Sequence, residues 1–347
     1  MIPDIPTSDR GKKHVSRWSR IISRTRAEMD RWYLKCVHWS ACIDPRAFTI
    51  VCLCILVFVS FFNYNAAAVD SEGHIGNAND ILFEQFPEHH FGYVWYATNA
   101  QYFCSAMVSM EHLLRTNPHH NIDLVFIIPE QRRDIISDRA LQRLDELRAT
   151  RTIVIKETAI PYHLEKWYYH DVMLKLTAFT LYEYRRVLIT DSDALIFRNL
   201  DHLFNLPDAL VATPHAQWLE GGDKPIFTTS LLLVIRPDRG AWSRIEQHFQ
   251  AKTEEADMDI INNEFRMDMI TLPSEYAALD VALATDKDAM AWYGEKAEDL
   301  VHDLFVIHFT GFKPWQVSVD PPPEWAQDKP VYFGLFQLWH QIESQVC

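Results

Sequence analysis

Glycine-rich phosphate loops are missing from this sequence of 347 residues, which contains only 10 glycines. The first expected strand is not followed by a G-x-G-x-x-G pattern, and no Walker-type loop occurs. The sequence also lacks internal repeats, low-complexity tracts and any N-x-Ser/Thr sequon. These absences disfavour a dinucleotide-binding fold of the glycine-rich type, a P-loop enzyme, a repeat protein and N-glycosylation of the chain.

Basic charge is scarce outside the first part of the chain. Residues 1–46 carry a net charge of +5, so the remainder carries −19 and the whole chain −14. A body this acidic does not suit the phosphate backbone of DNA or RNA, because that contact needs clustered lysine and arginine. Nucleic acid is therefore not an expected partner.

One long apolar run predicts a membrane anchor. Residues 47–69 contain no charge, and no lysine or arginine follows them until Arg115. The apolar content favours insertion, and the basic flank places the N-terminus in the cytosol. A cleaved signal peptide is the alternative. We expect a basic cytosolic tail (1–46), a transmembrane signal anchor (47–69), a lumenal stem (70–91) and one folded domain (92–347).

Six cysteines fit this topology. Four of them fall in the expected tail or anchor, namely Cys36, Cys42, Cys52 and Cys54. Only Cys104 and Cys347 would face an oxidising lumen, so at most one disulfide is available there. The sequence does not decide whether this disulfide forms.

Short apolar runs alternate with segments of helical spacing in the body. Strands are predicted at 93–97, 124–128, 152–155, 187–189, 209–213, 231–235 and 304–309. Helices are predicted at 102–114, 135–147, 172–184, 241–249 and 259–265. This alternation predicts an α/β fold whose mainly parallel sheet is covered on both faces.

Two carboxylates follow directly on one of the buried runs. Asp191 and Asp193 come after the apolar residues 187–189, and ligands bind at the carboxyl ends of strands in open α/β sheets. Acids this close repel each other unless a cation neutralises them. The alternative is a tight turn in which Asp and Ser are the turn formers.

A histidine and a lysine near the end of the body could complete such a site. His308 ends an expected strand and is followed by Gly311 and Lys313. A hard divalent cation takes oxygen ligands, and Mn²⁺ also accepts an imidazole. A ligand with two adjacent phosphates would match this set, with Lys313 neutralising further charge. A core histidine and a solvated lysine are the plainer alternatives.

Five motifs in one order resemble family 8 of the glycosyltransferases, the glycogenin-like retaining enzymes with a GT-A fold. The motifs are YATNAQY (96–102), KLTAF from Lys175, VLITDSDALIFRNLDHLF from Val187, DMDIIN from Asp257 and HFTGFKPW from His308. They extend over roughly residues 91–316. The DSDA sequence, the PHAQWL segment and Met258 resemble the fungal Golgi α-N-acetylglucosaminyltransferase-like branch.

The resemblance implies roles for individual residues. Asp191, Asp193 and His308 would bind Mn²⁺, with Mg²⁺ as the alternative metal. The donor-binding residues would be Ala97, Thr98, Asn99, Tyr102, Lys175, Ser192, Gly311 and Lys313. Asp257 and Lys175 would be the catalytic residues beside the donor sugar. Otherwise, the segment from Ala97 to Tyr102 would be a helix cap with a core aromatic, Asp257 a helix N-cap and Lys175 a snorkelling helix lysine.

The same resemblance implies transfer of a hexose or N-acetylhexosamine from a UDP-sugar to a glycan or glycoprotein acceptor, by an enzyme of the Golgi membrane. No dedicated nucleophile is evident, which favours front-face attack and leaves double displacement open. A metal-dependent UDP-sugar hydrolase or nucleotidyltransferase and a non-catalytic protein of the same fold are the alternatives. Thr228-Thr229-Ser230 and Met258 depart from the glycogenin pattern, so donor sugar, acceptor and linkage stay unspecified, as does the oligomeric state.

Overall fold

The structure, a computed structural model, describes residues 90–162, 171–219, 227–252 and 255–347. The expected tail, the expected anchor and nearly all of the expected stem lie outside these residues. Within the described ranges, no helix is both long and apolar enough to cross a membrane. The elements below all belong to the compact unit Asn77–Cys347.

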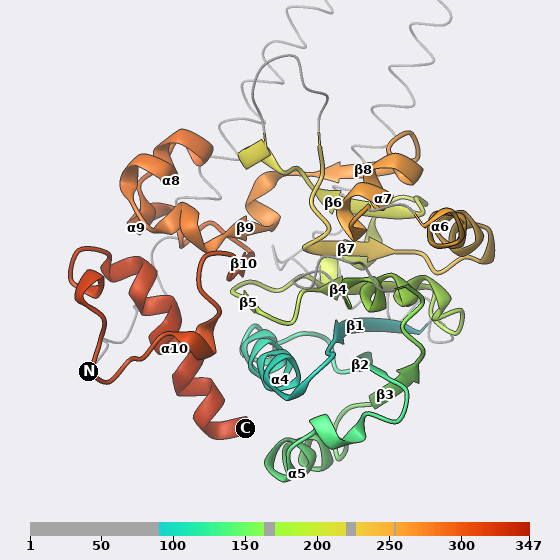
Figure 1. The fold of residues 1–347 in the computed structure, drawn as a ribbon, viewed down its shortest axis with the longest axis horizontal. Helices are drawn as coiled ribbons and strands as arrows, with labels where there is room; N and C mark the ends of the chain where they lie inside the picture. Colours follow the sequence, from blue (N-terminus) through green and yellow to red (C-terminus); the bar gives the residue numbers. More distant parts are fainter. Residues whose placement is uncertain (1–89, 163–170, 220–226, 253–254) are drawn as a thin grey trace, which may run out of the picture. The chain divides into compact units, whose positions relative to one another are not determined.

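A seven-stranded sheet forms the centre of this unit, as Figure 1 illustrates. Its order is β3-β2-β1-β4-β7-β6-β8. The strands are β1 (Phe91–Tyr96), β2 (Ile122–Pro129), β3 (Ile153–Thr158), β4 (Arg186–Thr190), β6 (Val211–Pro214), β7 (Leu232–Ile235) and β8 (Met269–Leu272). Of the described pairings, those of β7 with β4 and β6 are antiparallel and the others are parallel. The predicted mainly parallel α/β sheet is confirmed.

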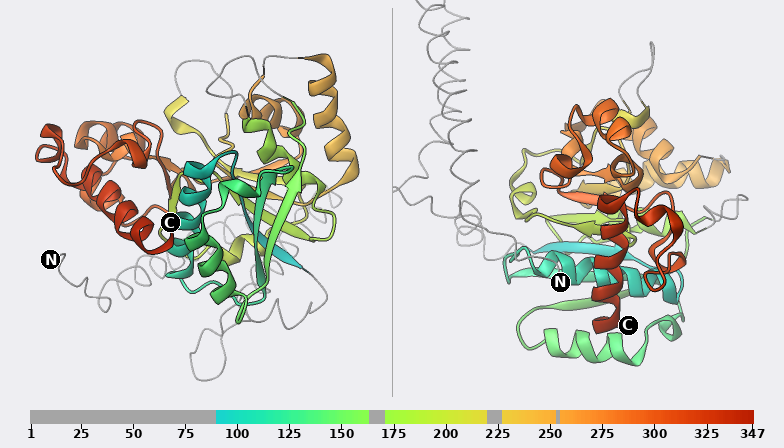
Figure 2. Two further views of the ribbon diagram at one scale, coloured as in Figure 1. Left: turned by 60° about the horizontal axis from the view of Figure 1, so that its bottom comes forward. Right: turned by 90° about the vertical axis from the view of Figure 1, so that its left-hand side faces the viewer.

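The central strands are apolar on both faces because each face has its own hydrophobic core. Successive side chains of a strand point to opposite faces, so Val94 packs in one core and Trp95 in the other. The helices α4 (Ala100–Leu114), α5 (Asp138–Leu147) and α10 (Pro330–Val346) contribute to the core of Trp95. The helices α6 (Arg239–Ala251) and α7 (Asp257–Phe265) contribute to the core of Val94. Helices therefore cover both faces of the sheet, as predicted (Figure 2).

One predicted helix has a different form. The sequence predicts an α-helix over 172–184, whereas the structure has a 3₁₀ helix, η3, over Val172–Thr180. The hydroxyls of Thr177 and Thr180 donate to the carbonyls of Leu174 and Thr177. Threonine hydroxyls offer carbonyl groups an alternative to the α-helical hydrogen bonds, and η3 is buried over most of its length. Tertiary packing thus decides a form that apolar spacing could not specify.

A second, three-stranded sheet has the order β5-β10-β9. It joins β5 (Ala194–Ile196), β10 (Val306–His308) and β9 (Ala278–Leu279). His308 pairs with Ala194 on one side and with Leu279 on the other. This register brings His308 beside the residue that follows Asp193, although 115 positions separate Asp193 and His308 in the sequence.

The end of the chain is fixed against α4. Cys104 of α4 and Cys347 form a disulfide, which settles the question that the sequence left open. The indole of Trp339 in α10 donates to the hydroxyl of Ser105 in α4 at 3.2 Å. The C-terminal helix is therefore a fixed part of the body.

Candidate active site

The candidate site lies where the order of the parallel strands reverses. The chain proceeds from β1 outward to β2 and β3, and then returns to β4 on the other side of β1. Such a reversal leaves a crevice outside the carboxyl ends of the two strands. Ala97 follows β1 and Asp191 follows β4, and the hydroxyl of Tyr96 donates to Oδ1 of Asp191 at 3.2 Å. The predicted donor segment and the acidic pair are therefore neighbours.

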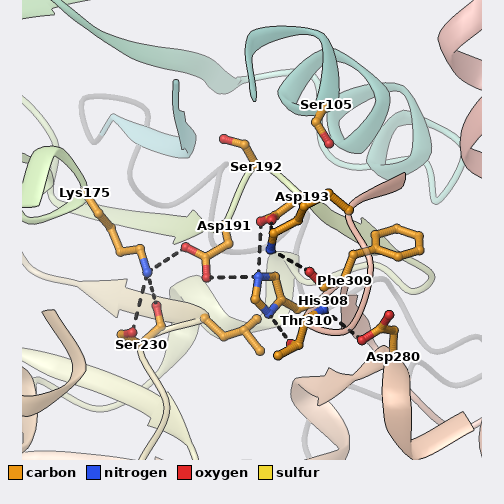
Figure 3. Close-up of polar contacts among 12 residues, drawn as sticks. Ser105, Lys175, Asp191, Ser192, Asp193, Ser230, Asp280, His308, Phe309 and Thr310 are labelled. Atoms are coloured by element: carbon orange, nitrogen blue, oxygen red, sulfur yellow. Dashed lines mark hydrogen bonds and ion pairs between the residues drawn. The ribbon is translucent and has the colours of Figure 1, made fainter. Parts of the chain in front are cut away.

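Asp191, Asp193 and His308 converge at this edge (Figure 3). Each offers one ligand atom, and the three atoms lie within 4.8 Å of one another. Nε2 of His308 is 3.1 Å from Oδ1 of Asp193 and 3.7 Å from Oδ2 of Asp191. Two carboxylate oxygens and one imidazole nitrogen suit a hard divalent cation such as Mn²⁺. The residues present fit the metal that the resemblance implies.

Positive charge surrounds Asp193. Nζ of Lys313 lies 2.6 Å from Oδ2 of Asp193 and 2.7 Å from the carbonyl oxygen of Phe309. Burial alone would raise the pKa of Asp193, but His308 and Lys313 hold it well below its usual range. Burial alone would lower the pKa of His308, but Asp193 and Asp191 raise it. The carboxylate form of Asp193 is therefore strongly favoured in the folded protein.

Lys175 connects this cluster to Asp257. Its Nζ lies 2.6 Å from Oδ1 of Asp191 and 2.7 Å from Oδ2 of Asp257, and it donates to the carbonyl of Ser230 at 3.1 Å. Burial alone would lower the pKa of Lys175, but the two carboxylates raise it above its usual range. The side chain is almost fully buried, so it does not snorkel to solvent. Asp257 is the first residue of α7 and Ala256 its N-cap, so the N-cap alternative is wrong.

The predicted donor segment begins helix α4. The side chain of Asn99 caps this helix by accepting from the backbone N–H of Tyr102 at 3.1 Å. The ring of Tyr102 packs edge-on against Trp315, which follows Lys313 in the HFTGFKPW motif. Ala97 is buried and Thr98 half-buried beside them. These residues border the acidic pair, as a donor-binding segment would.

Ser192 differs from its neighbours in the acidic motif. Its hydroxyl donates to the backbone carbonyl of Tyr96, and the residue is buried. This contact joins the ends of β1 and β4, so the serine supports the turn that carries the two aspartates. The plain interpretation made Ser192 a former of a local turn, whereas its hydroxyl bonds a carbonyl 96 positions away in the sequence.

Asp280 is a residue near the site that the motifs did not identify. It follows β9, is fully buried, and accepts hydrogen bonds from the backbone N–H groups of Thr310 and Gly311. Burial raises the pKa of its carboxyl, although these donors oppose that shift. A single acid within the otherwise apolar segment 277–283 was a usable signal, because a buried carboxylate needs partners.

Sequence comparison finds related proteins, although no family model matches the chain. The chain is 28% identical over 249 residues to Glucose N-acetyltransferase 1 of Gibberella zeae, covering 69% of this chain and 54% of the relative. It is 23% identical over 220 residues to glycogenin of Neurospora crassa, covering 62% of this chain and 30% of that relative. The chain thus spans about half the length of the first relative. The resemblance to family 8 and to its fungal branch is confirmed.

Comparison of structures supports the fold. The galactosyltransferase LgtC, solved in complex with donor and acceptor sugar analogues, aligns with a TM-score of 0.50 at 15% identity. The alignment covers 74% of this chain and 96% of that chain. At this identity the likeness concerns the fold alone, and it confirms the predicted GT-A class.

Proposed function

We propose that this chain, a relative of the family 8 glycosyltransferases, transfers a sugar from a nucleotide-sugar donor to a glycan acceptor with the help of a divalent metal. The convergence of Asp191, Asp193 and His308 at the carboxyl end of β4 carries this proposal. Sugar transfer from such a donor leaves negative charge on the departing diphosphate, which preorganised positive charge stabilises. The cluster, with Lys313 beside it, would supply that positive charge when it holds a metal.

The proposed metal would be held by the two aspartates and the histidine. When bound, a divalent cation supplies Lewis-acid stabilisation of the charge on the leaving diphosphate. Lys313 is the residue of this chain that would assist, because its Nζ already lies beside the cluster and its side chain is partly exposed. Mn²⁺ is the metal we propose, since the donor set contains an imidazole as well as oxygens.

Asp257 and Lys175 are proposed to position the donor sugar. The carboxylate of Asp257 is buried and held in an ion pair with Lys175. A carboxylate held in this way suits a hydrogen-bonding role better than attack on the anomeric carbon. This contact supports retention by front-face attack rather than through a covalent intermediate on Asp257. The proposed donor is a UDP-sugar carrying a hexose or an N-acetylhexosamine.

The proposed location is the Golgi membrane, with the folded body in the lumen. The uncharged run 47–69 and the basic flank before it support a single-pass type II anchor. The disulfide of Cys104 with Cys347 supports a secretory compartment, because such bonds are rare in the cytosol. Protease treatment of sealed microsomes tests this topology: a C-terminal tag should be protected and an N-terminal tag removed.

Incubation of the full chain with a panel of UDP-sugars and Mn²⁺, with and without glycan acceptors, tests the activity. Acceptor-dependent incorporation of sugar with retained anomeric configuration is expected. Equal release of sugar without acceptor would indicate a hydrolase, and transfer of the nucleotide would indicate a nucleotidyltransferase. Failure of UDP to stabilise the protein in the presence of Mn²⁺ would favour a non-catalytic protein.

A further inference from the structure

We propose that Asp280, together with Tyr332, is a positioning residue that holds the segment from His308 to Lys313 in the form needed to bind metal and diphosphate. The proposal rests on the proposed function and adds two residues to its site. Neither lies in the motifs that resemble family 8. We call Asp280 and Tyr332 the loop bracket.

The loop bracket acts on the backbone between the proposed metal ligand and the proposed diphosphate-binding lysine. Oδ1 of Asp280 accepts from the N–H of Thr310 at 2.8 Å and from the N–H of Gly311 at 3.2 Å. Oδ2 of Asp280 accepts from the hydroxyl of Tyr332 at 3.1 Å. Asp280 is 0% exposed, so water does not replace these partners. Figure 3 shows Asp280 beside Thr310 and near His308, one of the proposed metal ligands.

Fixing these two N–H groups holds the middle of a short loop. Only four residues, 309–312, separate His308 from Lys313. Oγ1 of Thr310 lies 2.9 Å from Nδ1 of His308, which leaves Nε2 directed at the aspartates. The N–H of Phe309 donates to the carbonyl of Asp193 at 3.0 Å. The loop is therefore held by Asp193 on one side and by Asp280 on the other.

Gly311 fits this arrangement because it has no side chain. A Cβ atom at this position would lie 2.8 Å from the hydroxyl of Tyr332 and 2.9 Å from Cγ1 of Val281. Both distances are shorter than ordinary contacts between such atoms. The resemblance to family 8 implies that Gly311 binds the donor. The structure adds a reason for glycine at this position, which is close packing of the loop against the loop bracket.

The loop bracket is anchored on rigid parts of the fold. Asp280 follows β9, whose Leu279 pairs with His308 in β10. Tyr332 lies in α10, which the disulfide Cys104–Cys347 joins to α4. Residues on firmly packed elements hold a site more accurately than residues on a loop alone.

The chain contains a matched control for a purely structural contact of the same kind. Asp201 is also buried, and it accepts from the hydroxyl of Tyr93 at 2.6 Å and from the N–H of His119 at 2.8 Å. It thus resembles Asp280 in burial and in donor types. None of its three described partners, the third being Asn199, is a residue of the candidate site.

The test compares Asp280→Ala, Asp280→Asn and Tyr332→Phe with the controls Asp201→Ala and Tyr93→Phe in the full chain. The first readout is hydrogen exchange at the amides of Thr310 and Gly311, which needs no ligand. The second is the dissociation constant of UDP in the presence of Mn²⁺. Thermal stability shows that each variant is folded.

Asp280→Ala should speed exchange at both amides and weaken UDP binding by about tenfold or more, because two N–H groups of the loop lose their buried carboxylate acceptor. Tyr332→Phe should act in the same direction but less strongly. Asp280→Asn should bind UDP more tightly than Asp280→Ala and nearly as tightly as wild type, since its carboxamide oxygen can still accept hydrogen bonds from the two N–H groups. Asp201→Ala and Tyr93→Phe should leave UDP binding within about twofold of wild type despite a similar loss of stability.

Two outcomes would overturn the proposal. The first is a folded Asp280→Ala variant with wild-type exchange at both amides or wild-type affinity for UDP. The second is an equal loss of affinity in Asp201→Ala, which would indicate general destabilisation. If wild-type protein itself does not bind UDP with Mn²⁺, the proposed function fails, and exchange at the two amides alone decides whether Asp280 holds the loop.

Discussion

Nζ of Lys175 lies 2.6 Å from Oδ1 of Asp191, so one oxygen of a proposed metal ligand is already neutralised by a buried cation. The other oxygen, Oδ2, faces His308 at 3.7 Å and remains the atom suited to a metal. The same ammonium group contacts Asp257 at 2.7 Å. Lys175 therefore connects the proposed metal ligand Asp191 with Asp257, the residue proposed to position the donor sugar.

Replacement of Lys175 should lower the stability of the protein. Lys175→Met leaves two buried carboxylates without their cation, so the free energy of unfolding should fall by about 3–5 kcal/mol. Denaturation in urea measures it. Lys156→Met is the control, because Lys156 pairs with Glu183 at 4.0 Å and its side chain is 44% exposed. That change should cost at most about 1 kcal/mol. A similar cost for both variants would contradict the prediction.

Asp193 should be indispensable for activity. Asp193→Asn removes the charge that both His308 and Lys313 contact, so sugar transfer should fall at least ~100-fold. The initial rate of acceptor glycosylation measures the effect. Asp238→Asn is a control, because the carboxylate of Asp238 caps α6 by accepting from the N–H of Ala241. Transfer at the wild-type rate by Asp193→Asn would rule out the metal assignment.

Gly311 should tolerate no side chain unless Tyr332 yields space. Gly311→Ala should lower the free energy of unfolding by about 1–3 kcal/mol, because the added methyl collides with Tyr332 and Val281. Tyr332→Phe in the same protein should recover part of this loss, which a double-mutant cycle in urea measures. Gly334→Ala is the control, since its added methyl meets nothing within 4 Å. Strict additivity of the two changes would argue against the contact.

His248 should make stability depend on pH. Its two ring nitrogens lie 2.6 Å from Glu255 and 2.7 Å from Glu264. Burial lowers the pKa of His248, but the hydrogen bonds to Glu264 and Glu255 raise it overall. A histidine whose pKa is raised on folding stabilises fully below its unfolded value of about 6.5, and this stabilisation is lost as pH rises through the folded pKa.

His248→Gln tests this dependence. The difference in melting temperature between wild type and variant should therefore be larger at about pH 6 than at about pH 9. Thermal unfolding at a series of pH values provides the measurement. Parallel pH profiles for the two proteins would show that His248 does not titrate in this range.

The disulfide between α4 and the C-terminus should stabilise the body. The double variant Cys104→Ser/Cys347→Ser should lose about 2–5 kcal/mol of unfolding free energy, because the unfolded chain gains freedom. Guanidinium unfolding measures the loss. Reductant should destabilise wild type towards the same value and leave the double variant unchanged. A double variant as stable as the oxidised wild type would show that the contacts of α10 suffice.

The fold class followed from local patterns because buried strands carry a strong local signal. The runs near Val94, Leu124 and Leu188 are apolar on both faces, which only a sheet covered on both sides accommodates. The helix predicted over 172–184 took another form, since apolar spacing does not separate an α-helix from a buried 3₁₀ helix.

The candidate site was only partly visible in the sequence. Asp191, Asp193, His308 and Lys313 stand in motifs whose residue types suit a metal and a diphosphate. Asp280 stands in no such motif, because its partners are backbone N–H groups and a tyrosine 52 residues away. Backbone donors leave no mark on residue identity, so the single acid in the apolar segment 277–283 indicates that a buried carboxylate needs partners but not which groups they are.

The sequence by itself determined the residue types at the site, the alternation of strands and helices, and the charge difference between the first 46 residues and the rest. Tertiary structure alone decided which of these residues meet. The pairing of β10 with β5 brings His308 to Asp193, and burial in the core brings Lys175 to Asp191 and Asp257. Such contacts depend on register and packing between distant segments, and these are properties of the whole chain.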